Sequence, residues 1–341
     1  MASGNGQEDW VAERARILKA TIDQLGLRIE GTYLEQLVTR LYAELDAAGI
    51  RFKPKVYLAD EWACPDGVPV IGIPFYLADE KLSRLEDEMM DGIEARSEDT
   101  ILAYLRHEAG HAINYAYKLY ELQEWNEVFG NYGAPYRDDF VPQPFSRNFV
   151  RHIPGFYAQK HPDEDFSETF AIWLTPGSRW QETYKSWAAH KKLAYVDRLM
   201  AELGSTLPKV TGEDYDIASD AIVHSLDEHY RLTKPSLTEL PPELDHELRA
   251  VFHSAPTRPP DAIPASTLIA QHRRALVVSI ADWTGLYDVT VRSLIAHFAE
   301  RSDQLELWVE ERERTDTLIR LVALTTALCM NRVHKGSFVL A

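Results

Sequence analysis

A helix over residues 98–120 that carries the pattern His107-Glu-Ala-Gly-His111 constrains this chain more than any other feature of its sequence. Ser97 can cap the start of this helix, because a serine side chain accepts a hydrogen bond from the first free backbone N–H groups. Residues four positions apart lie on one face of a helix, so both imidazoles can reach the same metal ion. Glu108 projects beside that ion, where a carboxylate can accept a proton from metal-bound water. The spacing therefore predicts a metal site with a general base beside it.

The residues at positions 114 and 117, which follow this pattern, exclude one class of metal site. A metzincin site would continue the pattern with Gly at position 114 and a third His at position 117. The chain has Asn114 and Tyr117 at these positions. A catalytic zinc takes three protein ligands and keeps one position open, so the third ligand must come from elsewhere in the chain.

The segment HPDEDFSETFA, residues 161–171, provides the better candidates for the third ligand. A helix is predicted over Pro162–Leu174, because proline suits the first helical position. Glu164 and Glu168 lie about 40° apart on one face of that helix. One carboxylate can bind the metal, and the other can accept the free imidazole N–H of a ligand histidine and orient it. Alternatively, the helix dipole favours acids at a helix start, which accounts for residues 163–165 but not for Glu168.

Three residues in the aromatic segment, just before Tyr157, are weaker candidates. Arg147, Arg151 and His152 could hold a substrate carboxylate, because arginine forms bidentate pairs with that group. Alternatively, they balance the acidic side chains nearby in the sequence. His152 and His161 are also alternative third ligands, because imidazole suits zinc as well.

From about residue 100 to residue 185 the chain resembles a known family. The HEAGH pattern, followed about fifty residues later by a Glu-x-Phe-x-Glu-x-Phe helix, is similar to the gluzincin group of zinc metallopeptidases. The segment HPDEDFSETFA resembles the third-ligand helix of the zinc-binding metallopeptidase family of bacteria. The resemblance implies one Zn²⁺ per chain, bound by His107, His111 and Glu164.

The same resemblance implies roles for three more residues. Glu108 is then the general base, Glu168 orients a ligand histidine, and Tyr157 helps to stabilise the transition state. A phenol near the metal can also donate to an oxyanion on chemical grounds. Alternatively, Tyr157 is one more aromatic residue in an aromatic segment. The relatives often have Asp where this chain has the longer Glu168, so the roles of Glu164 and Glu168 could be exchanged.

The charge balance and the cysteines argue against other classes of function. The 341 residues include 36 Lys and Arg against 53 Asp and Glu, which gives a formal charge of −17. We therefore expect neither nucleic acid nor an anionic membrane surface as a partner, since phosphate binding relies on basic residues. Cys64 and Cys329 lie far apart, which excludes a disulfide framework or a cysteine-based metal site. Without a signal-peptide pattern or an apolar run of about 18 residues, the protein is expected to be cytoplasmic.

The hydrophobic pattern predicts a mainly α fold with a small β-sheet, that is, an α+β protein. We expect a zincin-like catalytic domain over residues 1–235 and a helical C-terminal domain over residues 236–341. The strand Val68–Leu77 is the candidate edge for pairing with extended substrate. The other expected elements are an aromatic segment at 125–160 that lines a site, a strand at 52–58, and helices within 8–48 and at 78–94, 180–203, 214–231, 265–280, 289–312 and 314–331.

These features predict a zinc metallopeptidase that hydrolyses a peptide or protein substrate through a zinc-activated water, with Glu108 as the general base. One alternative is a zinc-bearing binding or regulatory protein without hydrolysis, in which the helical C-terminal domain holds a protein partner. Another is a zinc amidohydrolase that acts on a peptide-like metabolite. The intact Glu108 favours an enzyme, because a binding site needs no base beside the metal.

Overall fold

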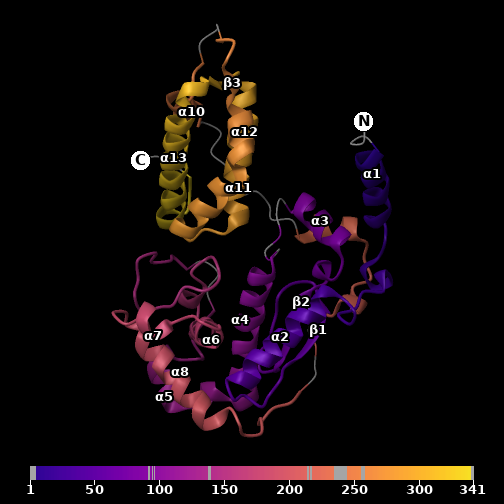
Figure 1. The fold of residues 1–341 in the computed structure, drawn as a ribbon, viewed down its shortest axis with the longest axis vertical. Helices are drawn as coiled ribbons and strands as arrows, with labels where there is room; N and C mark the ends of the chain where they lie inside the picture. Colours follow the sequence, from indigo (N-terminus) through magenta and orange to yellow (C-terminus); the bar gives the residue numbers. More distant parts are fainter. Residues whose placement is uncertain are drawn as a thin grey trace. The chain divides into compact units, whose positions relative to one another are not determined.

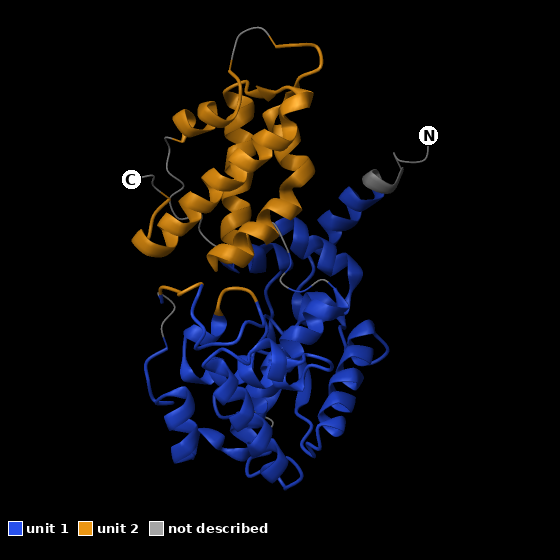
Figure 2. Ribbon diagram, turned by 60° about the vertical axis from the view of Figure 1, so that its left-hand side comes forward, with its two compact units in different colours: residues 1–140, 145–153, 157–234 blue, residues 141–144, 154–156, 235–341 orange. Residues whose placement is uncertain are grey.

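The computed structural model describes residues 5–90, 93, 95, 97–136, 140–212, 215, 217–233, 244–254 and 258–338. The chain divides into two compact units (Figure 2). The first unit comprises residues 1–140, 145–153 and 157–234, and the second comprises residues 141–144, 154–156 and 235–341. Most described residues are helical and few are in strands, which confirms the predicted mainly α class with a small sheet. Among the residues just named, none of the helices has the length and apolar character that crossing a membrane would need.

The first unit combines helices with a pair of strands (Figure 1). Its core consists of buried apolar side chains, contributed mainly by α2, α4, β2, α6 and α8. The bounds are α1 Asn5–Ile17, α2 Tyr33–Ala47, β1 Lys55–Ala59, β2 Val70–Pro74, α3 Glu80–Met89, α4 Glu98–Tyr117, α5 Gln123–Phe129, α6 Pro162–Leu174, α7 Trp180–Thr183, α8 Ala189–Leu203 and α9 Leu226–Thr233.

Helix α4 carries the histidine pattern through the interior of this unit. It begins at the predicted residue, because Ser97 and Thr100 cap it reciprocally: each side-chain hydroxyl accepts the backbone N–H of the other residue. It ends at Tyr117, earlier than predicted, because Lys118 adopts a left-handed φ of 53°. All residues from 105 to 117 are buried, so both histidines of the pattern lie inside the unit.

Helix α6 has the predicted bounds and packs directly against α4. Gly110 of α4 permits a close approach, since a Cβ atom at this position would lie 2.7 Å from the Cα of Ser167. Phe166 and Phe170 are fully buried, and Phe166 packs against the ring of Trp125. The aromatic residues thus hold α6 in the core while the glycine brings it against α4.

The strands β1 and β2 run parallel to each other. As expected for Val68–Leu77, β2 lies at an edge of this two-stranded sheet, but the outer side of β2 is partly covered. On the side of β2 away from β1, Gly72 exchanges two backbone hydrogen bonds with Ala63, with N···O distances of 2.7 and 3.3 Å. The connection between the strands therefore folds back towards β2, and Ala63 covers the middle of its outer edge.

Two expected helices in this unit differ from the structure. The helix expected at 180–203 is divided into α7 and α8 by the turn around residues 184–188. The helix expected at 214–231 begins only at Leu226. Upstream of it, Ala218 and Ser225 form backbone bridges to Ala59 and Thr21, which is incompatible with a continuous helix. Residues 213, 214 and 216 lie outside the described residues.

The second unit has its own apolar core, formed by its long helices. The helical continuation expected at residues 305–312 is wrong, because Glu306 adopts a φ of 53° and Trp308–Val309 pair with Ile263–Pro264 in an antiparallel ladder. Leu307 and Val309 are buried, so this stretch contributes to the core. The bounds are α10 Asp245–Val251, β3 Ile263–Pro264, α11 Ala265–Thr284, α12 Asp288–Gln304, β4 Trp308–Val309 and α13 Arg314–Lys335.

Candidate metal centre

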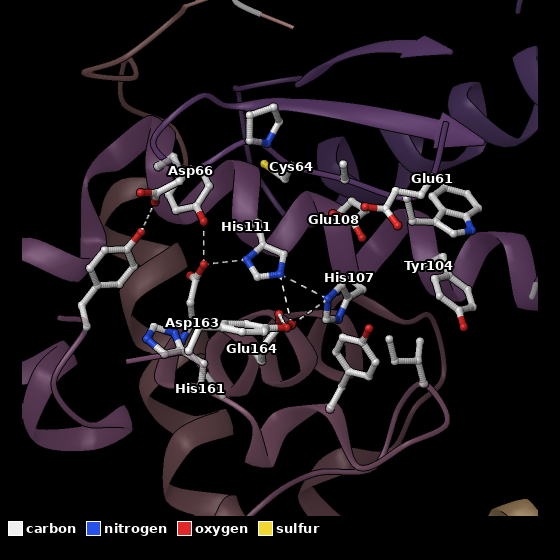
Figure 3. Close-up of a pocket in the computed structure, with 18 of the residues that line it drawn as sticks. Glu61, Cys64, Asp66, Tyr104, His107, Glu108, His111, His161, Asp163 and Glu164 are labelled. Carbon is white, nitrogen blue, oxygen red and sulfur yellow. Dashed lines mark hydrogen bonds and ion pairs between the residues drawn. The ribbon is translucent and has the colours of Figure 1, made fainter. Parts of the chain in front are cut away.

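Three ligand atoms from α4 and α6 meet within the first unit (Figure 3). His107 Nε2 lies 3.2 Å from His111 Nε2, and Glu164 Oε2 lies 3.1 and 3.3 Å from these two nitrogens. A tetrahedral zinc ion with bonds of about 2.0–2.1 Å places its ligand atoms about 3.3 Å apart. The triangle of these three atoms therefore has the size of one face of a zinc coordination shell.

The hydrogen bonds of the two imidazoles leave lone pairs at the centre of this triangle. His107 Nδ1 lies 2.8 Å from Glu168 Oε1, and His111 Nδ1 lies 2.8 Å from Asp163 Oδ2. Because a carboxylate only accepts, each Nδ1 of a neutral ring carries the N–H and each Nε2 presents a lone pair. Within the part of the chain that the structure describes, the buried Glu164 Oε2 receives no hydrogen bond. Three such lone pairs need a cation between them, and two imidazoles with one carboxylate suit zinc.

The charges around the site also favour a cation. Burial alone would lower the pKa of His107, but Glu164 and Glu168 raise it to about 10. The pKa of His111 is likewise raised against the effect of burial, by Asp163 and Glu164. Burial would raise the pKa of Glu164, yet the two histidines hold it well below its usual value. Carboxylates that attract a proton to these rings attract a metal ion in its place.

The two glutamates of α6 face different atoms of the site. Glu164 faces the Nε2 atoms, whereas Glu168 faces Nδ1 of His107. The second oxygen of Glu168 accepts the backbone N–H groups of His152 and Ile153, each at 3.2 Å. These two bonds fix the carboxylate and, through it, the orientation of the His107 ring.

Asp163 is a site residue that sequence reasoning missed. Its carboxylate contacts His111 and also accepts hydrogen bonds from Asn114 Nδ2 and the Tyr115 hydroxyl, both at 2.6 Å. In the sequence, the helix dipole is a sufficient reason for an acid at this position. One signal in the sequence could have found Asp163. His111 lies one turn after His107, so on an antiparallel helix the partner of His111 is expected about one turn before Glu168, the partner of His107.

Glu108 is buried and lines the cavity beside the ligand atoms (Figure 3). Burial raises the pKa of Glu108, and the neighbouring histidines partly offset this effect. The structure thus places a carboxylate that can accept a proton next to the three ligand atoms.

The part of the chain that builds this site matches a known protein family. Residues 79–203 match the family described as "Putative zinc-binding metallo-peptidase". The matched residues include both histidines, both glutamates of α6 and Asp163. This match and the three-ligand geometry together identify zinc as the cofactor. No curated protein and no solved structure matches the chain at a significant level.

Two tyrosines lie beside the candidate zinc ligands. The Tyr157 ring lies in a short 3-10 helix before α6, with its centroid 5.8 Å from that of His107 and the two planes at 87°. The Tyr136 hydroxyl donates to Glu164 Oε1 at 3.0 Å and so holds the ligand's second oxygen. Sequence reasoning did not single out Tyr136, because the aromatic segment has no periodicity that shows which side chains face a site.

The weaker candidates lie elsewhere. Arg147, Arg151 and His152 are not among the described residues that line the cavity. The Arg151 guanidinium lies 5.6 Å from the centroid of the Trp187 ring. Nε2 of His152 donates to the backbone carbonyl of Ala103 at 2.8 Å. The structure therefore does not bring these three side chains to the ligand atoms.

His161 lines the cavity, but both its ring nitrogens bind the backbone. Its Nε2 donates to the carbonyl of Ala134 at 2.9 Å, and its Nδ1 accepts the N–H of Asp163 at 3.2 Å. The imidazole therefore caps the start of α6 and has no nitrogen left for a metal ion.

A cavity of about 740 Å³ opens onto the ligand atoms, which is in the usual size range of ligand pockets. Residues 61–66 line one side of it, and tyrosines of the aromatic segment line another. At the end nearer His111, the Tyr132 hydroxyl donates to Asp66 and so links the two sides (Figure 3). The aromatic segment thus contributes to the cavity.

Proposed function

We propose that this protein is a zinc-dependent metallopeptidase that hydrolyses peptide bonds. The observation that carries the proposal is the position of Glu108, a buried carboxylate beside a three-ligand zinc site in a chain whose residues 79–203 match a metallopeptidase family. His107, His111 and Glu164 would hold the zinc ion.

Each residue near the ligand atoms has a defined part in this proposal. Bound zinc lowers the pKa of water to about 7 and polarises a carbonyl group. Glu108 accepts the proton of the attacking water and passes it to the leaving nitrogen. The Tyr157 hydroxyl donates a hydrogen bond to the oxyanion that develops on the substrate. Glu168 and Asp163 keep the two histidine rings in the orientation that presents Nε2.

The geometry favours hydrolysis over metal binding alone. A structural zinc site is closed by four protein ligands, whereas a catalytic site has three and an open position. The described residues provide three ligands here, next to a cavity that can admit a substrate. A buried carboxylate at that position serves a proton transfer but adds nothing to a binding site.

The test compares wild-type protein with Glu108→Gln, both loaded with one zinc, on a pool of quenched fluorescent peptides. We expect the wild type to cleave peptides and the variant to lose about 10²–10⁴-fold in kcat/KM with unchanged zinc content. Equal rates for both proteins would contradict the role of Glu108. Zinc binding without cleavage of any peptide or protein would favour the binding protein, and hydrolysis of small peptide-like amides alone would favour the amidohydrolase.

A further inference from the structure

The cavity ends, on the far side of His111 from His107, at a hydrogen bond between its two walls. The Tyr132 hydroxyl of the aromatic segment donates to Asp66, which lies in the connection between β1 and β2. Both residues line the cavity, and Figure 3 shows the Asp66 side chain at this end. A peptide chain that lies along the cavity therefore meets this bond and can pass it only by breaking it.

Asp66 is held in place by the turn in which it lies. The Val68 N–H donates to the carbonyl of Pro65 at 2.9 Å, which closes the turn. Gly67 supplies the φ of 73° that a turn of this kind needs at its third position. The Asp66 side chain therefore starts from a fixed backbone.

Tyr132 is held in place from the opposite wall. Its backbone N–H donates to Asn126 Oδ1 at 3.1 Å. Its ring stacks on that of Tyr120, with centroids 4.3 Å apart and planes 23° from parallel. Because both partners of the bond are supported, the Asp66 carboxylate has a defined position at the end of the cavity.

The bond to Tyr132 leaves the charge of Asp66 in place. A tyrosine hydroxyl is neutral and donates one proton, so the carboxylate keeps its negative charge and its second oxygen. Within the described part of the chain, no Lys or Arg forms an ion pair with Asp66 or lines the cavity. The other acid at this end, Asp163, already accepts three hydrogen bonds from α4. This end therefore attracts a cation and repels a carboxylate.

A closed end that carries a carboxylate suits the amino terminus of a peptide. The α-amino group has a pKa of about 7.7–8.0 and is mostly charged at neutral pH. Building on the proposed peptidase function, we propose that the cavity binds the free amino terminus of its substrate at Asp66, so that the enzyme removes residues from the amino end. The selectivity acts through binding, so it is separable from the hydrolytic step.

The test measures binding to zinc-loaded Glu108→Gln, which is designed to retain bound peptide. The probes are short peptides of Ala and Gly with fluorescein at the carboxyl end and either alanyl or propionyl at the amino end. Propionyl has the shape of alanyl without the ammonium group. We expect the alanyl peptide to bind about fivefold more tightly, as a partly exposed ion pair allows. Adding Asp66→Asn should bring the ratio close to one, whereas adding Asp220→Asn, an exposed aspartate outside the cavity, should leave it unchanged.

A third set of probes separates the amino terminus from a lysine side chain, which carries the same ammonium group. These are propionyl peptides with Lys at each position in turn. If one of them binds as tightly as the alanyl peptide and loses this affinity in Asp66→Asn, Asp66 serves a side chain and the inference is wrong.

Two further results would overturn the inference: equal binding of alanyl and propionyl peptides, or an unchanged ratio in the Asp66→Asn protein with normal zinc content and circular dichroism. Cleavage by the wild type is measured separately on the same peptides. Selective binding of the alanyl peptide without any cleavage would refute the peptidase proposal but support the amino-terminal site. Equal cleavage of alanyl and propionyl peptides would do the reverse.

Discussion

Gly110 of α4 lies directly against the backbone of Ser167 in α6, with no room for a side chain at the glycine position. Alanine in place of glycine normally stabilises a helix by about 1 kcal/mol. Here a Cβ would lie 2.7 Å from Ser167 Cα and 3.0 Å from its carbonyl oxygen, so the two helices would have to separate. The three ligand atoms span these two helices, and the site depends on this contact.

We therefore expect Gly110→Ala to lower the melting temperature and to weaken zinc binding together. The measurements are thermal unfolding and zinc competition titration. Gly212→Ala is the matched control, because a Cβ there meets its nearest neighbour at 3.9 Å. A Gly110→Ala protein that is more stable and binds zinc normally would show that α6 can shift without cost.

The carboxylates behind the histidines should tune zinc affinity without binding the ion themselves. Glu168→Ala and Asp163→Ala each remove the acceptor of one Nδ1–H, so we expect a loss of about 10–100-fold in zinc affinity. Glu164→Ala removes a ligand and should lose more than either. Competition with a chromophoric chelator measures all three on one scale. A greater loss in Glu168→Ala than in Glu164→Ala would mean that the two glutamates exchange roles.

Tyr157→Phe should reduce catalysis while leaving the metal site intact. Loss of one hydrogen-bond donor to an oxyanion costs about 10²–10³-fold in kcat. The ring remains, so its packing against His107 is retained and zinc content should stay at the wild-type level. Rates on a cleaved peptide, compared with zinc analysis of the same samples, separate these effects. Full activity in this variant would exclude the hydroxyl from the mechanism.

Acid should destabilise the first unit through His229, which lies well away from the candidate zinc ligands in sequence. Burial, together with the nearby His224, lowers the pKa of His229 to about 4. Between pH 6.5 and 4 the unfolded chain binds a proton at this position that the folded chain excludes. Stability is therefore fully present above pH 6.5 and falls as the pH drops towards 4. The unfolding midpoint followed by tryptophan fluorescence should depend less on pH in His229→Gln than in the wild type. The control His246→Gln, which removes an exposed imidazole, should behave as the wild type.

The sequence predicts the elements of the site better than the surroundings of the site. Helices α4 and α6 were predictable because capping residues and a spacing of four positions act locally. The partner of His111 was not predictable. An acid at position 163 is explained by the helix dipole as well as by a contact with His111, and only the packing of α6 against α4 decides between the two. Tyr136 was equally hidden, since the aromatic segment follows no helical or strand period.

The errors in the fold have a common physical cause. Val68–Leu77 carries the apolar residues of a strand, but nothing local shows that Ala63 returns to cover its outer side. A helix was expected to continue through residues 305–312, but Trp308 and Val309 pair with a distant segment of the chain. Long-range backbone pairing outweighs local propensity in both places.

Residues 61–66 fold back onto β2 and form a wall of the cavity. The side chains of this wall are therefore separate from those that hold the metal and those that build the sheet. The ligand-bearing helices are buried, so substitutions there disturb packing and zinc binding together. The wall at 61–66 joins the sheet through the backbone of Ala63, which any non-proline residue can provide. Side chains such as Glu61 and Trp62 can therefore be exchanged over evolution while the candidate metal centre stays the same.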